Sequence, residues 1–224
     1  MVQVKTYALP PTDLIPNSPH VLIHYPRLLE DLVKSPSFTP SAIYDTFARN
    51  GWYSQWIARY GPDQASHYHS AAHECMAVIS GEGATIRFGV ADASSDADGH
   101  ENGGVEVQAS LGDVFVLPAG VAHKTFRPRP DSIGLDFMAP EDENGKLVAS
   151  PTEARAYFEQ VKMTGAFMMM GAYPKGYEWD FMVGGEHKGR FPEVWNVSVP
   201  EADPVLGVDP EGLRGLWSNS AKKE

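Results

Sequence analysis

Cysteine is nearly absent from the chain, and long apolar runs are absent altogether. Cys75 is the only cysteine in 224 residues, so no intrachain disulfide can form, which suits a reducing compartment. No stretch of about 18 apolar residues occurs, which argues against a membrane-spanning helix. The first residues, MVQVKTYALPPTD, also lack the apolar run of a signal peptide. We therefore expect a soluble, cytoplasmic protein.

Positive charge is also scarce. The chain has 18 Lys and Arg residues against 29 Asp and Glu residues, and its formal net charge is -11. Such a charge repels nucleic acids and anionic membrane surfaces at long range. We expect neither as a partner, and predict a small-molecule substrate instead.

The composition favours one domain rich in β-strands. Hydrophobic residues make up 42% of the chain, enough for a sizeable core, and 21 glycines and 18 prolines suit many short strands joined by turns. We interpret residues 1–60 as a strand and helix that pack on a barrel, 61–183 as the barrel, and 184–224 as a C-terminal tail of the same domain.

Periodicity predicts the individual elements. The run HVLIHY at residues 20–25 indicates a strand at a sheet edge. From Ser41 to about Tyr60, apolar residues recur every three or four positions, which predicts a helix, interrupted near Gly51, over one mouth of the barrel. Residues 127–165 are interpreted as an insertion outside the barrel that ends in a helix, and 167–173 as a buried strand.

The spacing of three histidines and one glutamate predicts a metal site. Two residues apart in a strand, His67 and His69 share a face, and the following four-residue turn returns Glu74 opposite them. His123 follows a strand and a Pro-Gly turn in GDVFVLPAGVAH, and it can supply a third imidazole. Three imidazoles and a carboxylate suit one divalent ion of iron, manganese, nickel, cobalt or zinc.

These spacings resemble the two motifs of the cupin superfamily. The first motif, G-x5-H-x-H-x4-E-x6-G, is matched at every position, and the second, G-x5-P-x-G-x2-H, is matched likewise. The matching residues are Gly61, His67, His69, Glu74, Gly81, Gly112, Pro118, Gly120 and His123. Arg127 stands where the second motif usually ends in asparagine.

Other segments are similar to the YjlB-type branch of cupins. They are IPNSPHVLIHY, ARNGWYSQW, HYHSAAHE, GAYPKGYEWD and DPVLG. The resemblance implies an all-β fold, a single cupin double-stranded β-helix or jelly-roll barrel, here with an N-terminal helix and a helical insertion. It further implies a metal inside the barrel and a possible homodimer, but no particular reaction.

Six further side chains are candidates for contacting a substrate: Arg87, Trp52, Trp56, Met168, Tyr173 and Trp179. A guanidinium binds a carboxylate well, but Arg87 fits the outer face of its strand equally well. Aromatic residues and methionines at such spacings are more often ordinary core. His73 should turn away from its neighbour Glu74, which favours a structural role.

Three functions remain open at this stage. The leading hypothesis is a mononuclear metalloenzyme, an Fe-type dioxygenase, that acts on a small oxygenated organic molecule, with Glu74 as the catalytic base. A non-redox isomerase, decarboxylase or lyase would use the same ligands and a proton-transferring side chain. A small-molecule-binding cupin without catalysis is the third, because a fold does not settle a function.

Overall fold

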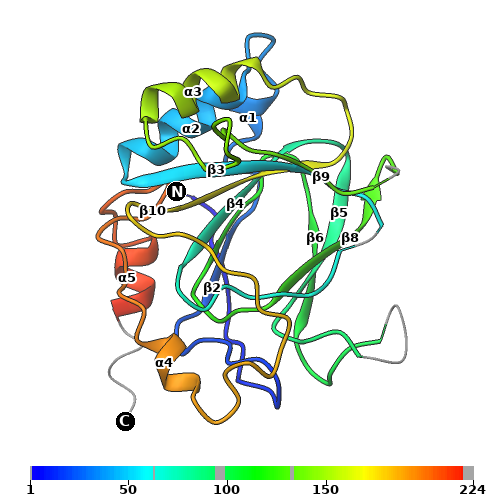
Figure 1. The fold of residues 1–224 in the computed structure, drawn as a ribbon, viewed down its shortest axis with the longest axis vertical. Helices are drawn as coiled ribbons and strands as arrows, with labels where there is room; N and C mark the ends of the chain where they lie inside the picture. Colours follow the sequence, from blue (N-terminus) through cyan, green and yellow to red (C-terminus); the bar gives the residue numbers. More distant parts are fainter. Residues whose placement is uncertain (1, 63, 94–98, 132–133, 219–224) are drawn as a thin grey trace.

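Antiparallel strands form most of the regular structure of the computed structural model, which describes residues 2–62, 64–93, 99–131 and 134–218 (Figure 1). The larger sheet has the spatial order β1 (Lys5–Tyr7), β2 (Leu22–Tyr25), β7 (Val114–Leu117), β4 (Glu74–Ser80), β10 (Met168–Pro174), β3 (Trp52–Arg59) and β9 (Asp136–Met138). The smaller sheet has the order β6 (Val105–Ala109), β5 (Gly83–Phe88) and β8 (His123–Arg129).

The chain crosses repeatedly from one sheet to the other. The consecutive strands β4 and β5 belong to different sheets, and so do β6 and β7, and β7 and β8. β4 pairs with β7, and β5 pairs with β8. This exchange of strands between two antiparallel sheets gives a jelly-roll barrel and confirms the predicted fold class.

The inside of the barrel holds one of the three apolar clusters that the described residues form. Met76 and Val78 of β4 pack between the sheets with residues of β5 and β7, as their alternation with Glu74 predicts. Their neighbours Cys75 and Ala77 belong to a separate cluster on the outer face of the larger sheet. The central strands are therefore buried on both faces, which explains their continuous apolar runs.

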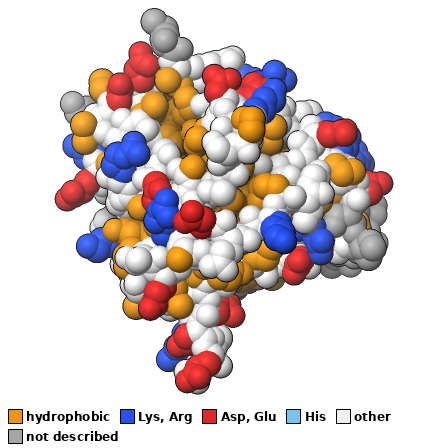
Figure 2. Space-filling model, turned by 90° about the horizontal axis from the view of Figure 1, so that it is seen from above, with side chains coloured by type: hydrophobic (Ala, Val, Ile, Leu, Met, Phe, Trp, Pro, Cys, Tyr) orange, Lys and Arg blue, Asp and Glu red, His pale blue; other side chains and the backbone are white. Residues whose placement is uncertain are grey.

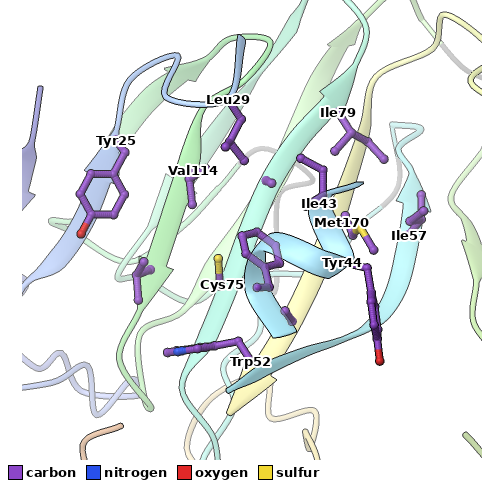
Figure 3. Packing of buried hydrophobic residues seen from close by; sticks show 14 of the residues in the cluster. Tyr25, Leu29, Ile43, Tyr44, Trp52, Ile57, Cys75, Ile79, Val114 and Met170 are labelled. Carbon is purple, nitrogen blue, oxygen red and sulfur yellow. The ribbon is translucent and has the colours of Figure 1, made fainter. Parts of the chain in front are cut away.

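Helices cover this outer face. They are α1 (Glu30–Val33), α2 (Pro40–Arg49), α3 (Pro151–Gln160) and α5 (Leu213–Ser218). The remaining helix, α4 (Phe191–Trp195), packs elsewhere: the indole of Trp195 donates to the carbonyls of Pro16 and Asn17. Figure 3 shows the outer cluster, in which Ile43 of α2 lies over Met170 of β10 and Trp52 lies near Cys75. Ser150 accepts a hydrogen bond from the backbone N–H of Glu153 and so caps α3, in agreement with the predicted helix there.

The helix predicted from Ser41 to Tyr60 is wrong in its second half. α2 ends at Arg49, and after Gly51 the chain continues as β3, which pairs with β10 and β9. Gly51 has a φ of +80°, a left-handed conformation that ends helices. The apolar spacing of residues 52–59 fitted a helix, but pairing with two strands decided the outcome. α2 itself packs on the outer face of the larger sheet and not over a barrel mouth.

Two other expectations also need correction. The strand predicted at 20–25 is present as β2, but it is not at an edge, because β1 pairs with its outer side. The segment 127–165 does not lie wholly outside the barrel, because its β9 pairs with β3 as an edge strand of the larger sheet. The barrel sheet therefore includes strands from residues 1–60 as well as from 61–183.

Arg127, at the departure from the second motif, has a left-handed backbone. Its φ is +51°, and it lies where the register between β8 and β5 shifts. Asparagine adopts this conformation more readily than most residues, which gives a physical reason for the motif's usual choice. Arg127 keeps the turn and places its guanidinium 5.3 Å from the centre of the Phe126 ring.

The face that carries the helices has charges of both signs. Figure 2 shows acidic and basic side chains interspersed on it, with hydrophobic side chains between them. Among the described residues, no helix is both long and apolar enough to cross a membrane.

Candidate metal site

Backbone pairing brings the four predicted ligands to one place inside the barrel. His67 and His123 form an antiparallel bridge, in which each backbone N–H donates to the carbonyl of the other, at 3.1 and 2.8 Å. The backbone N–H of Gly120 donates to the carbonyl of His69 at 2.8 Å, which holds the two motifs together. Glu74 opens β4, beside β7, as the predicted chain reversal requires.

The four side chains converge. The possible ligand atoms of His67, His69 and His123 all lie within 4.8 Å of one another. Glu74 Oε1 lies 3.4 Å from His69 Nε2, and its Oε2 lies 3.2 Å from His123 Nε2. All four residues are buried.

Hydrogen bonds orient the imidazoles. Nδ1 of His67 faces the carbonyl oxygen of Ala65 at 3.1 Å, Nδ1 of His69 faces that of Asp180, and Nδ1 of His123 faces that of Val121 at 3.4 Å. A carbonyl oxygen only accepts, so we assign the proton of each ring to Nδ1. Each Nε2 then turns a lone pair towards the shared centre, which is the arrangement of metal-binding histidines.

The pKa values favour the protonation states that a metal needs. Burial and the neighbouring histidines hold the pKa of His67 well below its usual value, and burial lowers the pKa of His123. Burial alone would raise the pKa of Glu74, but His69, His123 and a hydrogen bond from Tyr173 lower it to about 2. The carboxylate of Glu74 is therefore ionised at neutral pH, and His67 and His123 are neutral beside it. Only the pKa of His69 is raised, because the attraction of Glu74 outweighs burial.

This donor set fits a cation. Glu74 Oε2 is buried and has no hydrogen-bond partner among the described residues. A buried anionic oxygen that faces several lone pairs is costly without a positive charge between them. Three neutral nitrogens and one carboxylate match the preferences of divalent iron, manganese, nickel, cobalt and zinc, so these residues can hold such an ion.

A small pocket with an aromatic rim opens beside the four side chains. Its volume is about 90 Å³. Phe137, Trp179 and Phe181 line it and are 50%, 41% and 49% exposed, unusually high for large apolar side chains. The ring of Phe181 stacks on His67, with 4.2 Å between centroids. The site is thus reached through a ring of aromatic side chains.

A chain of hydrogen bonds supports Glu74 from the pocket wall. The indole Nε1 of Trp56 donates to Tyr173 Oη at 3.0 Å, and the Tyr173 hydroxyl donates to Glu74 Oε1 at 2.6 Å. Burial and the charge of Glu74 hold the pKa of Tyr173 well above its usual value, so Tyr173 remains a donor.

A β-bulge places the indole of Trp56 in this chain. Ser54 pairs with Ala172 and Trp56 pairs with Gly171, so Gln55 is an extra residue in β3. Beyond it the alternation changes phase: Trp52 packs in the outer core, whereas Trp56 packs in the inner core.

Of the six predicted substrate contacts, Trp56, Tyr173 and Trp179 line the pocket, whereas Trp52, Met168 and Arg87 do not. Trp52 and Met168 lie in the outer core. Arg87 lies on the opposite face of β5 from its inward neighbours and pairs with Glu106 of β6 at 2.9 Å. Arg87 therefore lies outside the metal pocket, on the outer face of its strand, which is the alternative that the sequence left open.

His73 and Cys75 lie away from the site. His73 Nδ1 accepts the backbone N–H of Ala119 at 2.9 Å, and its ring packs on Trp217, which agrees with the predicted structural role. Burial raises the pKa of Cys75 well above its usual value, so its thiol stays protonated in the outer core.

Four pocket residues were missed: Tyr60, Gln64, Phe137 and Phe181. Phe137 was not predicted because it lies in β9, within the segment interpreted as an insertion outside the barrel. Phe181 directly follows the GAYPKGYEWD segment, whose last residue, Asp180, accepts from the backbone N–H of Ser70 at 2.6 Å and holds the His69 loop. That segment was the one available signal that this part of the chain meets the site.

Comparison with known proteins agrees with the motifs. No protein-family model matches the chain. The uncharacterized protein YjlB of Bacillus subtilis (strain 168) is 26% identical over 218 residues, which cover 96% of this chain and 97% of YjlB. The whole-length match supports the YjlB-type branch, and the two sheets carry both sets of motif ligands to one centre. The chain has the cupin fold.

Two solved structures show a weak likeness to this chain. RmlC from Streptococcus suis, in complex with dTDP-D-xylose, is 8% identical, with 80% of this chain and 76% of that chain covered and a TM-score of 0.33. Acireductone dioxygenase from Bacillus anthracis, with a cadmium ion in its active centre, is 14% identical, with 73% and 80% covered and a TM-score of 0.29. At these values the named activities belong to those proteins and say nothing of this chain's reaction.

Proposed function

We propose that this protein is a mononuclear metal-dependent enzyme, of the Fe-type dioxygenase class, that acts on a small oxygenated organic molecule. His67, His69, Glu74 and His123 would hold the ion. When bound, such an ion supplies a Lewis acid and a template that brings oxygen ligands together. The observation that carries the proposal is the convergence of three imidazoles on one ionised carboxylate beneath an aromatic rim.

The metal pocket contains few acid–base groups, which favours dioxygen chemistry over the non-redox alternatives. Apart from the four proposed ligands, the titratable side chains lining the pocket within the described residues are Tyr60 and Tyr173. Burial and the charge of Glu74 raise the pKa of both, so both stay protonated. Isomerisation or elimination needs a base and an acid whose pKa values lie near the working pH. Glu74 is ionised and can serve as the base, but the described lining holds no acid whose pKa lies near the working pH, because both tyrosines stay protonated.

The size and walls of the pocket indicate the substrate. A volume of about 90 Å³ admits only the reacting end of a molecule, well below the ~300–1,000 Å³ of sites that enclose a whole ligand. The rest would lie between the exposed rings of Phe137, Trp179 and Phe181, which favour flat, apolar partners. A phenol or an enol meets both conditions.

The protein's own groups would then act as follows. Glu74, ionised, would accept the proton of an acidic substrate hydroxyl, and the Tyr173 hydroxyl would hold the carboxylate in place through its 2.6 Å hydrogen bond. Phe181 would exclude water from the face of His67 on which it stacks.

The test begins with the metal. Elemental analysis of protein purified without added metal should find about one transition metal ion per chain. The metal-free protein is then reconstituted anaerobically with iron(II), manganese(II), nickel(II), cobalt(II) or zinc(II), and catechols and cyclic enols are screened for dioxygen uptake. We expect uptake that depends on the metal and on the substrate.

A matched pair of histidine variants serves as the control. His67→Gln should lose metal and activity, whereas His100→Gln, in an exposed loop, should keep both. No uptake with any metal would remove the dioxygenase proposal. Conversion of a compound by the zinc form without dioxygen would establish the non-redox alternative, and tight retention without turnover would establish a binding protein.

A further inference from the structure

Two polar side chains in the metal pocket have no part in the proposed metal shell. They are Tyr60, which directly follows β3, and Gln64 in the loop after it. The backbone N–H of Tyr60 donates to the carbonyl of Phe167 at 3.0 Å, and the Tyr60 side chain is only 2% exposed. Gln64 is half-buried, and its Oε1 accepts the backbone N–H of Thr125 in β8 at 2.6 Å. Both side chains are therefore held in place on the wall of the pocket.

The contact with β8 fixes the orientation of the Gln64 amide. A backbone N–H only donates, so the amide atom that faces Thr125 is the oxygen, and the nitrogen lies on the other side. Burial and the charge of Glu74 raise the pKa of Tyr60, whereas Thr125 and Gln64, as donors to the Tyr60 oxygen, act against this rise. The Tyr60 oxygen is thus faced by donors, and its own O–H is left to donate.

The polar hydrogens that remain free in the pocket belong to these two side chains. The indole of Trp56 is committed to Tyr173, and the Tyr173 hydroxyl is committed to Glu74. Among the described residues, no acceptor is hydrogen-bonded to Tyr60 Oη, and Gln64 Nε2 keeps a free hydrogen. Neither atom is among the polar atoms that are both unpaired and sealed from solvent, so a molecule in the pocket can reach them. Below the aromatic rim, the described lining therefore offers two donors, and its one free acceptor is the carboxylate of Glu74.

Such a pair of donors favours an oxygen that carries negative charge. Hydrogen bonds to an ionised oxygen are roughly twice as strong as those between neutral groups. A buried anion also needs an opposite charge nearby. Imidazoles that bind a metal are neutral, so a divalent ion beside the single carboxylate of Glu74 would keep one net positive charge. One substrate oxyanion would neutralise it.

We propose that Tyr60 and Gln64 bind the substrate as an oxyanion, with the Tyr60 O–H and a Gln64 N–H donating to the ionised oxygen of a phenolate or enolate. The inference rests on the proposed function, in which Glu74 accepts the proton that the substrate hydroxyl gives up. It narrows the substrate class to molecules that ionise to a monoanion in the pocket. Because Tyr60 stays protonated, it binds and orients the substrate and transfers no proton.

The probe is 4-nitrophenol, whose visible absorption reports whether it is ionised, and its partner is nitrobenzene, the same ring without the hydroxyl. Both are titrated into the full-length protein loaded with zinc(II), after the zinc content per chain has been measured. Zinc has no redox chemistry, so the measurement does not depend on dioxygen. We expect 4-nitrophenol to bind as the yellow anion, with its pKa lowered in the complex, and nitrobenzene to bind more weakly.

Two variants each remove one donor. Tyr60→Phe removes only the O–H, and Gln64→Glu keeps an oxygen for the backbone N–H of Thr125 but loses the amide nitrogen. Each should weaken binding of the 4-nitrophenol anion roughly ten- to hundredfold, as expected for one hydrogen bond to a charged group, and should raise the pKa of the bound probe. Zinc content and nitrobenzene binding should not change. Tyr53→Phe, on β3 but outside the metal pocket, should bind the anion as the wild type does.

The outcomes separate this inference from the proposed function. Anion binding that either variant retains in full, or that nitrobenzene matches in strength, would overturn the inference and leave the metal site untouched. A protein that retains none of the five metal ions would remove the proposed function, and this inference with it. Anion binding that needs both residues, in a protein that takes up no dioxygen with any metal, would support the inference and refute only the dioxygenase class.

Discussion

Gly171→Ala offers a sharp test of the wall behind Glu74. Gly171 in β10 has no left-handed backbone requirement, so alanine suits its conformation. A Cβ there, however, would lie 2.1 Å from Cε2 and Cζ2 of Trp56 and 2.7 Å from its Nε1. Contacts this short do not occur, so the indole must move, and its hydrogen bond to Tyr173 must break.

The expected cost follows from three contributions. Overpacking a buried site costs about 1–3 kcal/mol, and losing one buried hydrogen bond costs about 0.5–1.5 kcal/mol. Replacing glycine by alanine restricts the unfolded chain and offsets about 0.4–1 kcal/mol. The free energy of unfolding should therefore fall by about 0.5–4 kcal/mol. In a chain of this size, each kcal/mol lowers the melting temperature by ~2–4 °C.

Urea unfolding, followed by circular dichroism, measures this loss. The matched control is Gly134→Ala, where an added Cβ meets no atom within 4 Å. In a Trp56→Leu background, which lacks the clashing ring atoms, Gly171→Ala should cost almost nothing. An equal cost in both backgrounds, or a Gly171→Ala protein as stable as the wild type, would refute the proposed packing of the indole.

Three other predictions concern the surroundings of the site. Burial, with His20 as a lesser cause, lowers the pKa of His73 from 6.5 to about 4, so the stability that neutral His73 contributes is full above pH 6.5 and is lost as the pH falls towards 4. Between pH 7 and pH 5, the free energy of unfolding of metal-free His73→Gln should therefore fall by about 2 kcal/mol less than that of the metal-free wild type. Equal losses would contradict this. Asp203→Asn should cost about 2–4 kcal/mol in urea unfolding, because the buried carboxylate accepts four hydrogen bonds that an amide cannot all accept, whereas Asp209→Asn at an exposed turn should cost under about 1 kcal/mol. Tyr173→Phe should weaken metal binding about tenfold in chelator competition, because Glu74 loses its supporting donor; unchanged affinity would show that the 2.6 Å bond does not position the carboxylate.

The ligands could be predicted from sequence because their geometry is local. His67 and His69 share a strand face, and Glu74 follows one turn later, so spacing alone sets three of the four positions. His123 needed the second motif, since its approach depends on the bridge to His67 across the barrel. The tautomer of each histidine then follows from the carbonyl oxygen that its Nδ1 faces, and residue spacing does not reveal that contact.

Pairing between distant strands is what the periodicity could not show. Residues 52–59 fit a helix pattern, and the sheet made them a strand. Within that strand, the extra residue Gln55 shifts the alternation of side chains. Trp52 therefore packs in the outer core and Trp56 in the inner core, although the two are four residues apart. The position of Arg87 likewise depended on which face of β5 turns inward.

The segments that mark the YjlB-type branch are arranged around the metal site and its supports. GAYPKGYEWD carries Gly171 and Tyr173 at one end and Asp180, which faces the His69 ring, at the other. Asn50 of ARNGWYSQW donates to the carbonyl of Pro204 in DPVLG, at 2.9 Å.

The motif ligands alone would give this protein only the general metal chemistry of a cupin. One of the other segments, GAYPKGYEWD, supplies Tyr173 as the donor to Glu74, Trp179 of the aromatic rim and Asp180 as the anchor of the His69 loop. We therefore expect substrate choice to depend on these segments. Exchanging the residues that surround the four ligands for those found in a cupin should change how tightly the metal is held before it changes which substrate ring fits between the aromatic side chains.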